Sequence, residues 1–205
     1  MDTYKVGEVV AVLGACYGET EMARAFRDPF QFLVAVMLSA RSKDSTTIPV
    51  AKELFSVAPT PEAILKLPRH KIEKILHPIG FFRVKAAYAH GIARKIVECG
   101  TPTTFDELVS LPGVSRKTAN VVLSQFYGEP AIAVDVHVER ITNRLGWIST
   151  KIPEETEHAL QKIVPRERWK DVNRLLVQHG QTICLPRKPK CSNCPISQYC
   201  EKIGV

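Results

Sequence analysis

Apolar residues recur at helical spacing along most of the chain, and almost no alternating strand pattern or βαβ rhythm is present. Residues 4–17 repeat valine and leucine at this spacing, and Gly18 follows as a helix stop. Asp28-Pro29 supplies a cap and a first-turn proline for a second helix, which is apolar on nearly every side through Leu38 and should be central. One further helix is predicted to end near Val57, and a short helix is predicted to begin at Thr60-Pro61. Four more are predicted to cover about Arg69–Leu76, Val84–Val97, Pro153–Val164 and Arg168–Gln178. Gly180 is predicted to end regular structure. The predicted fold class is therefore all-α.

The stretch from Thr104 to Arg144 is predicted to form a helix, a tight hairpin, a helix, a short loop and a helix, with Thr104 and Glu107 spaced as a capping box. The hairpin reads Leu-Pro-Gly-Val-Ser, and its glycine permits a turn geometry that residues with a Cβ resist. Backbone N–H groups and the dipole at the start of the next helix favour an anion such as a phosphate. A purely structural hairpin is the commoner case, so the turn alone is a weak signal. The residues assigned to contacts with a nucleic-acid backbone are Leu111, Gly113, Val114, Ser115 and Arg116.

Two charged residues of this stretch are candidate catalysts. Lys117 falls in the first turn of the helix after the hairpin, where the helix dipole disfavours the charged form and favours a nucleophilic amine. The alternative for Lys117 is a simple phosphate contact. Asp135 is placed to cap the next helix. Capping holds a carboxylate in a fixed orientation, so Asp135 can be both a helix cap and a catalyst. His137 is predicted to be a structural hydrogen-bonding residue, and its neighbours Val136 and Val138 are predicted to pack.

The charge balance suggests a polyanionic partner. The formal net charge is +7, and most of the excess of lysine and arginine falls in residues 111–205, the half that begins with the hairpin. Solvated surface charge is the alternative explanation. No apolar run approaches the length of a membrane span, and the N-terminus has no basic region before an apolar core. We therefore expect no membrane association and no secretion, with the protein in the cytoplasm beside the nucleoid of a prokaryote or in the nucleus of a eukaryote.

The C-terminal tail carries a strong metal-site signal. Four cysteines follow one another with six, two and five intervening residues, which suits either tetrahedral zinc or an iron–sulfur cluster. Disulfides are less compatible with a chain that lacks a secretory signal. Cys16 and Cys99 stand apart, and we expect them to be buried structural thiols. A basic loop lies between the first two tail cysteines and suits a phosphate backbone. The metal ligands are predicted to be Cys184, Cys191, Cys194 and Cys200, and the basic loop offers Arg187, Lys188 and Lys190.

Three motifs in this order resemble the endonuclease III family of helix-hairpin-helix DNA glycosylases. They are LPGVSRKTANVVL, then AVDVHVERITNRLG, then the four-cysteine tail. The resemblance implies two helical lobes flanking a cleft for double-stranded DNA. A six-helix barrel lobe would span residues 22–130, and residues 1–21 with 131–205 would form the lobe that carries a [4Fe-4S] cluster. The sequence shows no oligomerisation seam, so a monomer is the expected state.

The resemblance also implies a reaction. Lys117 matches the catalytic lysine of the family and Asp135 its catalytic aspartate. The damaged nucleotide would be flipped out of the duplex, Lys117 would attack the sugar C1′, and Asp135 would stabilise the developing charge or assist deprotonation of the lysine. A Schiff base and β-elimination would then cut the strand beside the abasic site. The expected substrates are oxidised pyrimidines of the thymine glycol type.

Two further segments, MLSARSKD and IGFFRVKA, resemble the DNA-wedging loops of the family. Arg41, Phe81 and Phe82 stand where glutamine and leucine-tyrosine are common, which puts the opposite-base and lesion preferences in doubt. Arg41 could bond the orphaned base, and Phe81 could either fill the vacated stack or be a core residue. Ser115 replaces the last glycine of the usual hairpin and would be strained in a left-handed conformation. The alternatives for function are a uracil or thymine mismatch glycosylase and a non-catalytic DNA-shape or redox-sensing binder.

Overall fold

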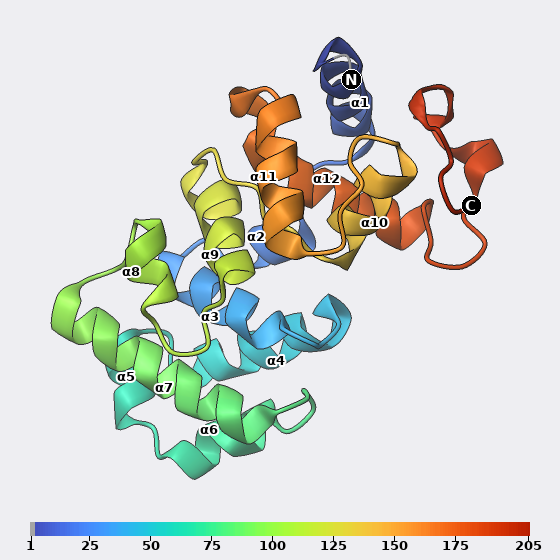
Figure 1. Cartoon of the computed structure of the whole chain (residues 1–205). Helices are drawn as coiled ribbons and strands as arrows, with labels where there is room; N and C mark the ends of the chain where they lie inside the picture. The colour runs from blue at the N-terminus through green and yellow to red at the C-terminus, as the bar shows by residue number, and fades with distance from the viewer. Residues whose placement is uncertain (1–2) are drawn as a thin grey trace. The chain divides into compact units, whose positions relative to one another are not determined.

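The computed structural model describes the chain from Thr3 to Val205, and every regular element within those residues is helical. The predicted all-α class is confirmed. The chain divides into two compact units, one continuous over Glu21–Tyr127 and one that joins the residues up to Thr20 with Gly128–Val205 (Figure 1). Within Thr3–Val205, no helix combines the length and apolarity that crossing a membrane requires.

The continuous unit is built around α3 (Pro29–Ser39), which has eight of its eleven residues buried. The Asp28 side chain caps this helix by accepting a hydrogen bond from the Gln31 N–H at 3.0 Å, and Pro29 occupies the first turn. The helix packs against α4, α7 and α9, so the predicted central helix is confirmed (Figure 1). The other elements of this unit are α2 (Glu21–Ala25), α4 (Asp44–Val57), α5 (Pro61–Lys66), α6 (Arg69–Leu76), α7 (Phe82–Cys99), α8 (Phe105–Val109), α9 (Arg116–Val122) and the π-helix η1 (Leu123–Tyr127).

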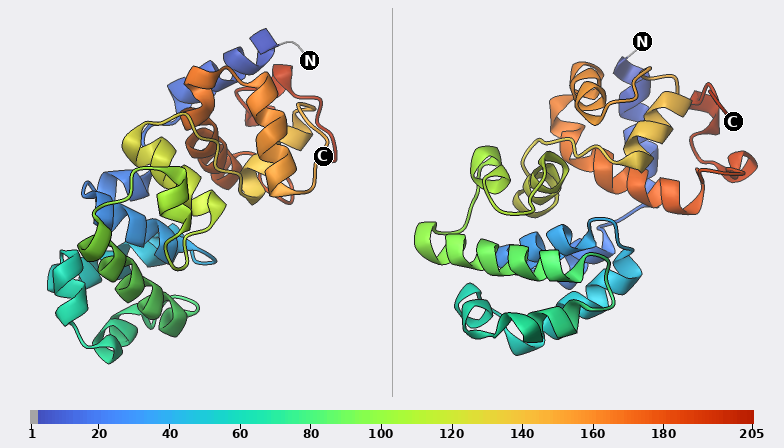
Figure 2. Two further views of the ribbon diagram at one scale, coloured as in Figure 1. Left: turned by 60° about the vertical axis from the view of Figure 1, so that its left-hand side comes forward. Right: turned by 60° about the horizontal axis from the view of Figure 1, so that its bottom comes forward.

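The second unit has its own hydrophobic core, formed by α1 (Thr3–Cys16), α10 (Val136–Arg144), α11 (Pro153–Ile163) and α12 (Trp169–Thr182). Helix α12 packs along both α1 and α10, and Figure 2 shows α10 and α12 side by side. Three short 3-10 turns complete the unit: η2 (Arg166–Arg168), η3 (Cys191–Asn193) and η4 (Ser197–Tyr199). The last two turns belong to the cysteine tail.

Several helix boundaries differ from the prediction. Gly180 does not end α12, which continues to Thr182, because the glycine serves a close packing contact and not a turn. A Cβ at Gly180 would collide with His137 and lie 2.9 Å from Nη2 of Arg140. Helix α7 begins at Phe82 and not at Val84. The short helix α2 and the π-helix η1 were not predicted.

Three predictions of burial were wrong. Cys16 and Cys99 are exposed and are not buried structural thiols. Val136 is 71% exposed because it occupies the first turn of α10 on the side away from the core, whereas Val138 is fully buried as expected.

Candidate active site

The hairpin is seated on α7 by two close backbone approaches. A Cβ on Gly91 would stand 2.7 Å from Cγ of Pro112, and a Cβ on Gly113 would collide with the Tyr88 ring. Gly113 also adopts the left-handed conformation, with φ of 76°, that side chains with a Cβ resist. The capping box of Thr104 and Glu107 is present at the start of α8. Both glycines are therefore required where they stand, and they fix the hairpin relative to α7.

The hairpin residues divide into buried and exposed groups. Leu111 and Val114 have buried side chains, and the N–H of Val114 already donates to the Leu111 carbonyl at 3.2 Å. These two side chains therefore anchor the turn, so the DNA contacts predicted for Leu111 and Val114 would come from their backbone atoms. Gly113, Ser115 and Arg116 are exposed and can contact a ligand.

Ser115 replaces glycine in this hairpin without strain. Its φ is −83°, in the extended region, and its hydroxyl accepts the Thr118 N–H at 3.2 Å as the N-cap of α9. The expected cost of a left-handed serine does not arise here. The serine instead caps the helix that carries Lys117.

Lys117 lies in the first turn of α9 and is exposed, directly after the hairpin. The next three residues of α9, Thr118 to Asn120, are buried, so the exposed lysine stands on a helix whose other face is fixed in the core. The π-helix η1 continues α9, and the Ser124 hydroxyl donates to the Asn120 carbonyl at 2.7 Å within this stretch. An amine on such a rigid support can be a nucleophile or a phosphate ligand.

Asp135 caps α10, as the sequence indicated. Its Oδ1 accepts the N–H groups of His137 at 2.9 Å and Val138 at 3.0 Å, and the residue is half-buried. The extended approach to it is held by the Asn173 amide, which donates to the Ala133 carbonyl at 2.9 Å. His137 hydrogen-bonds Nη2 of Arg140 through Nδ1 at 3.1 Å, which fits the structural role expected for it. The carboxylate is therefore held in one orientation.

The two loops predicted to meet DNA both contain a residue with positive φ. Arg41 has a φ of 55° and Phe81 a φ of 59°. The Phe81 side chain is 60% exposed, so the core alternative for it is wrong. The guanidinium of Arg41 lies 5.6 Å from the centroid of the Phe81 ring, within cation–π range. Phe82 is half-buried, with its ring 5.0 Å from that of His77.

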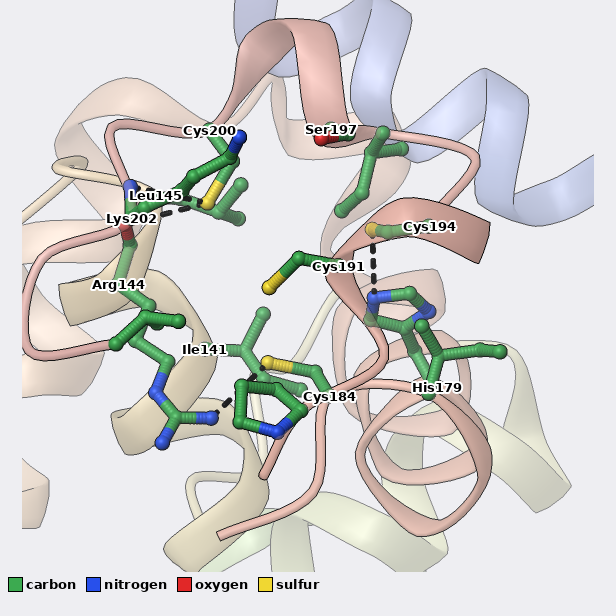
Figure 3. Close-up of a pocket in the computed structure, with 14 residues that line it drawn as sticks. Ile141, Arg144, Leu145, His179, Cys184, Cys191, Cys194, Ser197, Cys200 and Lys202 are labelled. Atoms are coloured by element: carbon green, nitrogen blue, oxygen red, sulfur yellow. Dashed lines mark hydrogen bonds between the residues drawn. The ribbon is translucent and has the colours of Figure 1, made fainter. Parts of the chain in front are cut away.

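The four tail cysteines line a single pocket together with several apolar side chains (Figure 3). Ile141, Leu145 and Ile196 contribute to the walls. Donors approach two of the sulfurs: Nη1 of Arg144 lies 3.4 Å from Sγ of Cys184, and the Lys202 N–H lies 3.3 Å from Sγ of Cys200. Cysteine sulfurs gathered in one pocket are the ligands that an iron–sulfur cluster requires. The donor set therefore fits such a cluster.

Two arginines of α10, neither of which was predicted to have a role, brace the start of the tail. Arg144 is buried and donates to the Leu185 carbonyl at 2.7 Å and to the Pro186 carbonyl at 3.0 Å. Arg140 donates to the Cys184 carbonyl at 2.9 Å. Their spacing of four residues places them on one face of α10, which is the signal that could have paired them.

His179 is a further residue of the pocket that sequence reasoning missed. It is 1% exposed, and burial lowers its pKa to about 4, so the ring is neutral at neutral pH. Nδ1 lies 3.1 Å from the Tyr17 hydroxyl and Nε2 lies 3.6 Å from Sγ of Cys194. If the tyrosine donates, the proton of the ring faces the sulfur. The sequence signal that could have placed His179 near the metal ligands is its position five residues before Cys184.

Comparison with known proteins decides the family. Residues 34–166 match the model of the HhH-GPD superfamily of base excision DNA repair proteins, and residues 184–200 match the iron–sulfur binding domain of endonuclease III. The chain belongs to the endonuclease III family. It is therefore a DNA glycosylase and abasic-site lyase of base excision repair, and its cofactor is a [4Fe-4S] cluster.

Individual relatives agree with this endonuclease III assignment over nearly the full chain. Endonuclease III of Thermotoga maritima is 42% identical over 85% of this chain and 83% of its own length. A solved structure of a non-covalent endonuclease III–DNA complex superposes with a TM-score of 0.89 at 33% identity, covering 98% of this chain and 96% of that one. A trapped endonuclease III–DNA covalent intermediate gives 0.87 at 33% identity, covering 98% and 97%.

Proposed function

We propose that this protein is a bifunctional glycosylase that removes oxidised pyrimidines of the thymine glycol type from double-stranded DNA and cleaves the resulting abasic site through Lys117. The observation that carries the proposal is the exposed lysine in the first turn of α9, directly after the hairpin. A mere binder needs no amine at this position. A related endonuclease III has been trapped as a covalent intermediate with DNA, which supports a nucleophilic route.

In the first half of the reaction, the nitrogen lone pair of neutral Lys117 forms a bond to C1′ of the flipped nucleotide. The bond from C1′ to the base breaks, and the base leaves with that electron pair and takes up a proton. Asp135 is assigned to stabilise the positive charge that develops on the sugar, or to accept the proton that Lys117 loses. Its fixed orientation as the cap of α10 supports this assignment.

In the second half, the bond from C1′ to the ring oxygen opens, the oxygen takes up a proton, and a Schiff base joins C1′ to Nζ of Lys117. Removal of a C2′ proton then expels the 3′ phosphate by β-elimination, which cuts the strand. Water hydrolyses the Schiff base and restores the lysine. None of these steps requires an oxidant or a reductant, so the iron–sulfur cluster takes no part in the chemistry.

DNA would be held by two groups of contacts. The exposed hairpin residues Gly113, Ser115 and Arg116 are assigned to the phosphate backbone. The basic tail loop adds three exposed cations, Arg187, Lys188 and Lys190. When bound, the [4Fe-4S] cluster supplies a covalent link between the four tail cysteines, which we assign as its ligands, and thereby fixes this loop.

Lesion exposure is assigned to the two wedge loops. Phe81, exposed and left-handed, would enter the space that the flipped nucleotide leaves, and Arg41 would bond the base opposite. Arginine pairs well with the acceptor edge of guanine. We therefore expect a preference for guanine opposite the damaged pyrimidine. We also expect the protein to act on these duplexes as a monomer.

The test is a single-turnover assay that follows base release and strand cleavage separately on two duplexes. One duplex contains thymine glycol and the other a uracil–guanine mismatch. Base release from thymine glycol with coupled strand cleavage is the expected result. Base release from the mismatch alone, without cleavage, would identify a mismatch glycosylase and contradict the proposal.

A further inference from the structure

A buried lysine connects the two loops that carry Arg41 and Phe81. Lys85 lies on α7 and is 4% exposed, although its side chain ends in an ionisable amine. Nζ donates to the Ala40 carbonyl at 2.8 Å and lies 3.1 Å from the Ser42 hydroxyl. These two acceptors flank Arg41 on both sides. The lysine therefore fixes the backbone of the first loop from within.

The same lysine belongs to the turn that follows Phe81. The Lys85 N–H donates to the Phe81 carbonyl at 3.0 Å, the first hydrogen bond of α7. The Arg41 carbonyl also lies 3.9 Å from the position that a Cβ on Gly80 would take, so the two loop backbones are neighbours. One residue thus holds the first loop through its side chain and begins the helix that presents Phe81.

Burying the Lys85 amine has a desolvation cost, and filling space in the core does not explain why an amine is present there. Both acceptors of its amine are uncharged, and burial lowers the pKa of Lys85. An apolar side chain of similar length would fill the same volume without this penalty. What the amine adds is a fixed position of the first loop on the helix that follows Phe81, and both loops contain a non-glycine residue at positive φ.

We propose that Lys85 is a positioning residue that locks both loops into one DNA-inserting unit, so that Arg41 reaches the base opposite the lesion in register with Phe81. The proposal rests on the wedge role assigned to these two residues above. Lys85 itself touches neither the lesion nor the reacting atoms. Its replacement should therefore alter how the opposite base is read while the chemistry at Lys117 is retained.

The test compares Lys85→Met with Lys95→Met, which changes an exposed lysine of the same helix. The substrates are a single-stranded abasic oligonucleotide, which needs no wedge, and thymine glycol duplexes with guanine or adenine opposite. Lys85→Met is expected to lose about tenfold on the duplexes and to change by no more than about twofold on the single strand. The ratio of guanine to adenine rates should fall toward one, whereas Lys95→Met should match the wild type.

Equal losses on single strand and duplex, or an unchanged guanine-to-adenine ratio, would overturn the role of Lys85. Ser42→Ala keeps the lysine and removes one acceptor, so it should lower the same ratio by a smaller factor even if Lys85→Met does not fold. An unchanged ratio in a folded Ser42→Ala variant would likewise overturn the proposal. A wild-type protein that cleaves none of these substrates would instead contradict the proposed function.

Discussion

At the scale of single residues, Asp135 combines a structural and a chemical role that can be separated. Its Oδ1 caps α10 through two backbone N–H groups, a bond pattern that asparagine can reproduce with its own side-chain oxygen. The asparagine lacks the negative charge and carries an NH2 donor in place of the second carboxylate oxygen. The charge is what the developing positive sugar requires.

Asp135→Asn should therefore keep the fold and lose the reaction. We expect the free energy of unfolding to change by less than about 0.5 kcal/mol and the single-turnover rate to fall by about a hundredfold or more. Thermal unfolding and rapid-quench assays on a thymine glycol duplex provide the two measurements. Asp135→Ala, which removes the cap as well, should cost about 1 kcal/mol of stability in addition. A wild-type rate in Asp135→Asn would exclude the charge from the mechanism.

At the scale of elements, the sequence located helices well wherever local signals decide them. The bounds of α6 agree with the prediction, and Asp28, Thr60 and Asp135 cap the helices that they were expected to cap. The failure at Gly180 came from treating glycine as a stop when its function is to admit the side chains of His137 and Arg140. A sequence pattern does not distinguish these two uses of glycine, because the second depends on a helix about 40 residues away in the chain.

The energy of the close contact at Gly180 can be measured by comparing it with a glycine that lies inside a helix and makes no such contact. Gly180→Ala should destabilise the protein by about 1–3 kcal/mol, because the added methyl group displaces His137 and Arg140. Gly7→Ala in α1 meets no atom within 4 Å and should stabilise by up to about 1 kcal/mol through helix propensity. Denaturant unfolding of both variants measures these changes. Equal changes in the free energy of unfolding for the two substitutions would show that the close contact at Gly180 does not contribute to stability.

At the scale of the whole molecule, the two candidate catalysts come from different units. Lys117 belongs to Glu21–Tyr127 and Asp135 to the unit that contains the tail. Both could be found from the sequence because each lies in a short local motif. Lys85 and His179 could not, because Lys85 bonds residues 43 and 45 positions away and the Tyr17 partner of His179 is 162 positions away. Such pairs exist only after the chain has folded.

The charge excess of the whole chain should appear in the salt dependence of DNA binding. Replacing Arg187, Lys188 and Lys190 together by alanine should weaken binding to all duplexes alike and reduce the slope of log K against log salt by about 1 for each phosphate that the loop no longer neutralises. Fluorescence anisotropy across a salt series measures the slope. Lys66→Ala, an exposed change on α5, is the control and should leave it unaltered. An unaltered slope in the triple variant would remove the loop from the binding surface.

The most direct test of the central claim is borohydride trapping on a duplex that contains one thymine glycol. Borohydride reduces a Schiff base to a stable amine, so a covalent enzyme–DNA adduct reports the intermediate itself. We expect an adduct with the wild type and with Lys95→Ala, none with Lys117→Ala, and peptide mapping that places the DNA on Lys117. An adduct that persists in Lys117→Ala, or base release by the wild type with no adduct on any substrate, would contradict the assignment of Lys117 as the nucleophile.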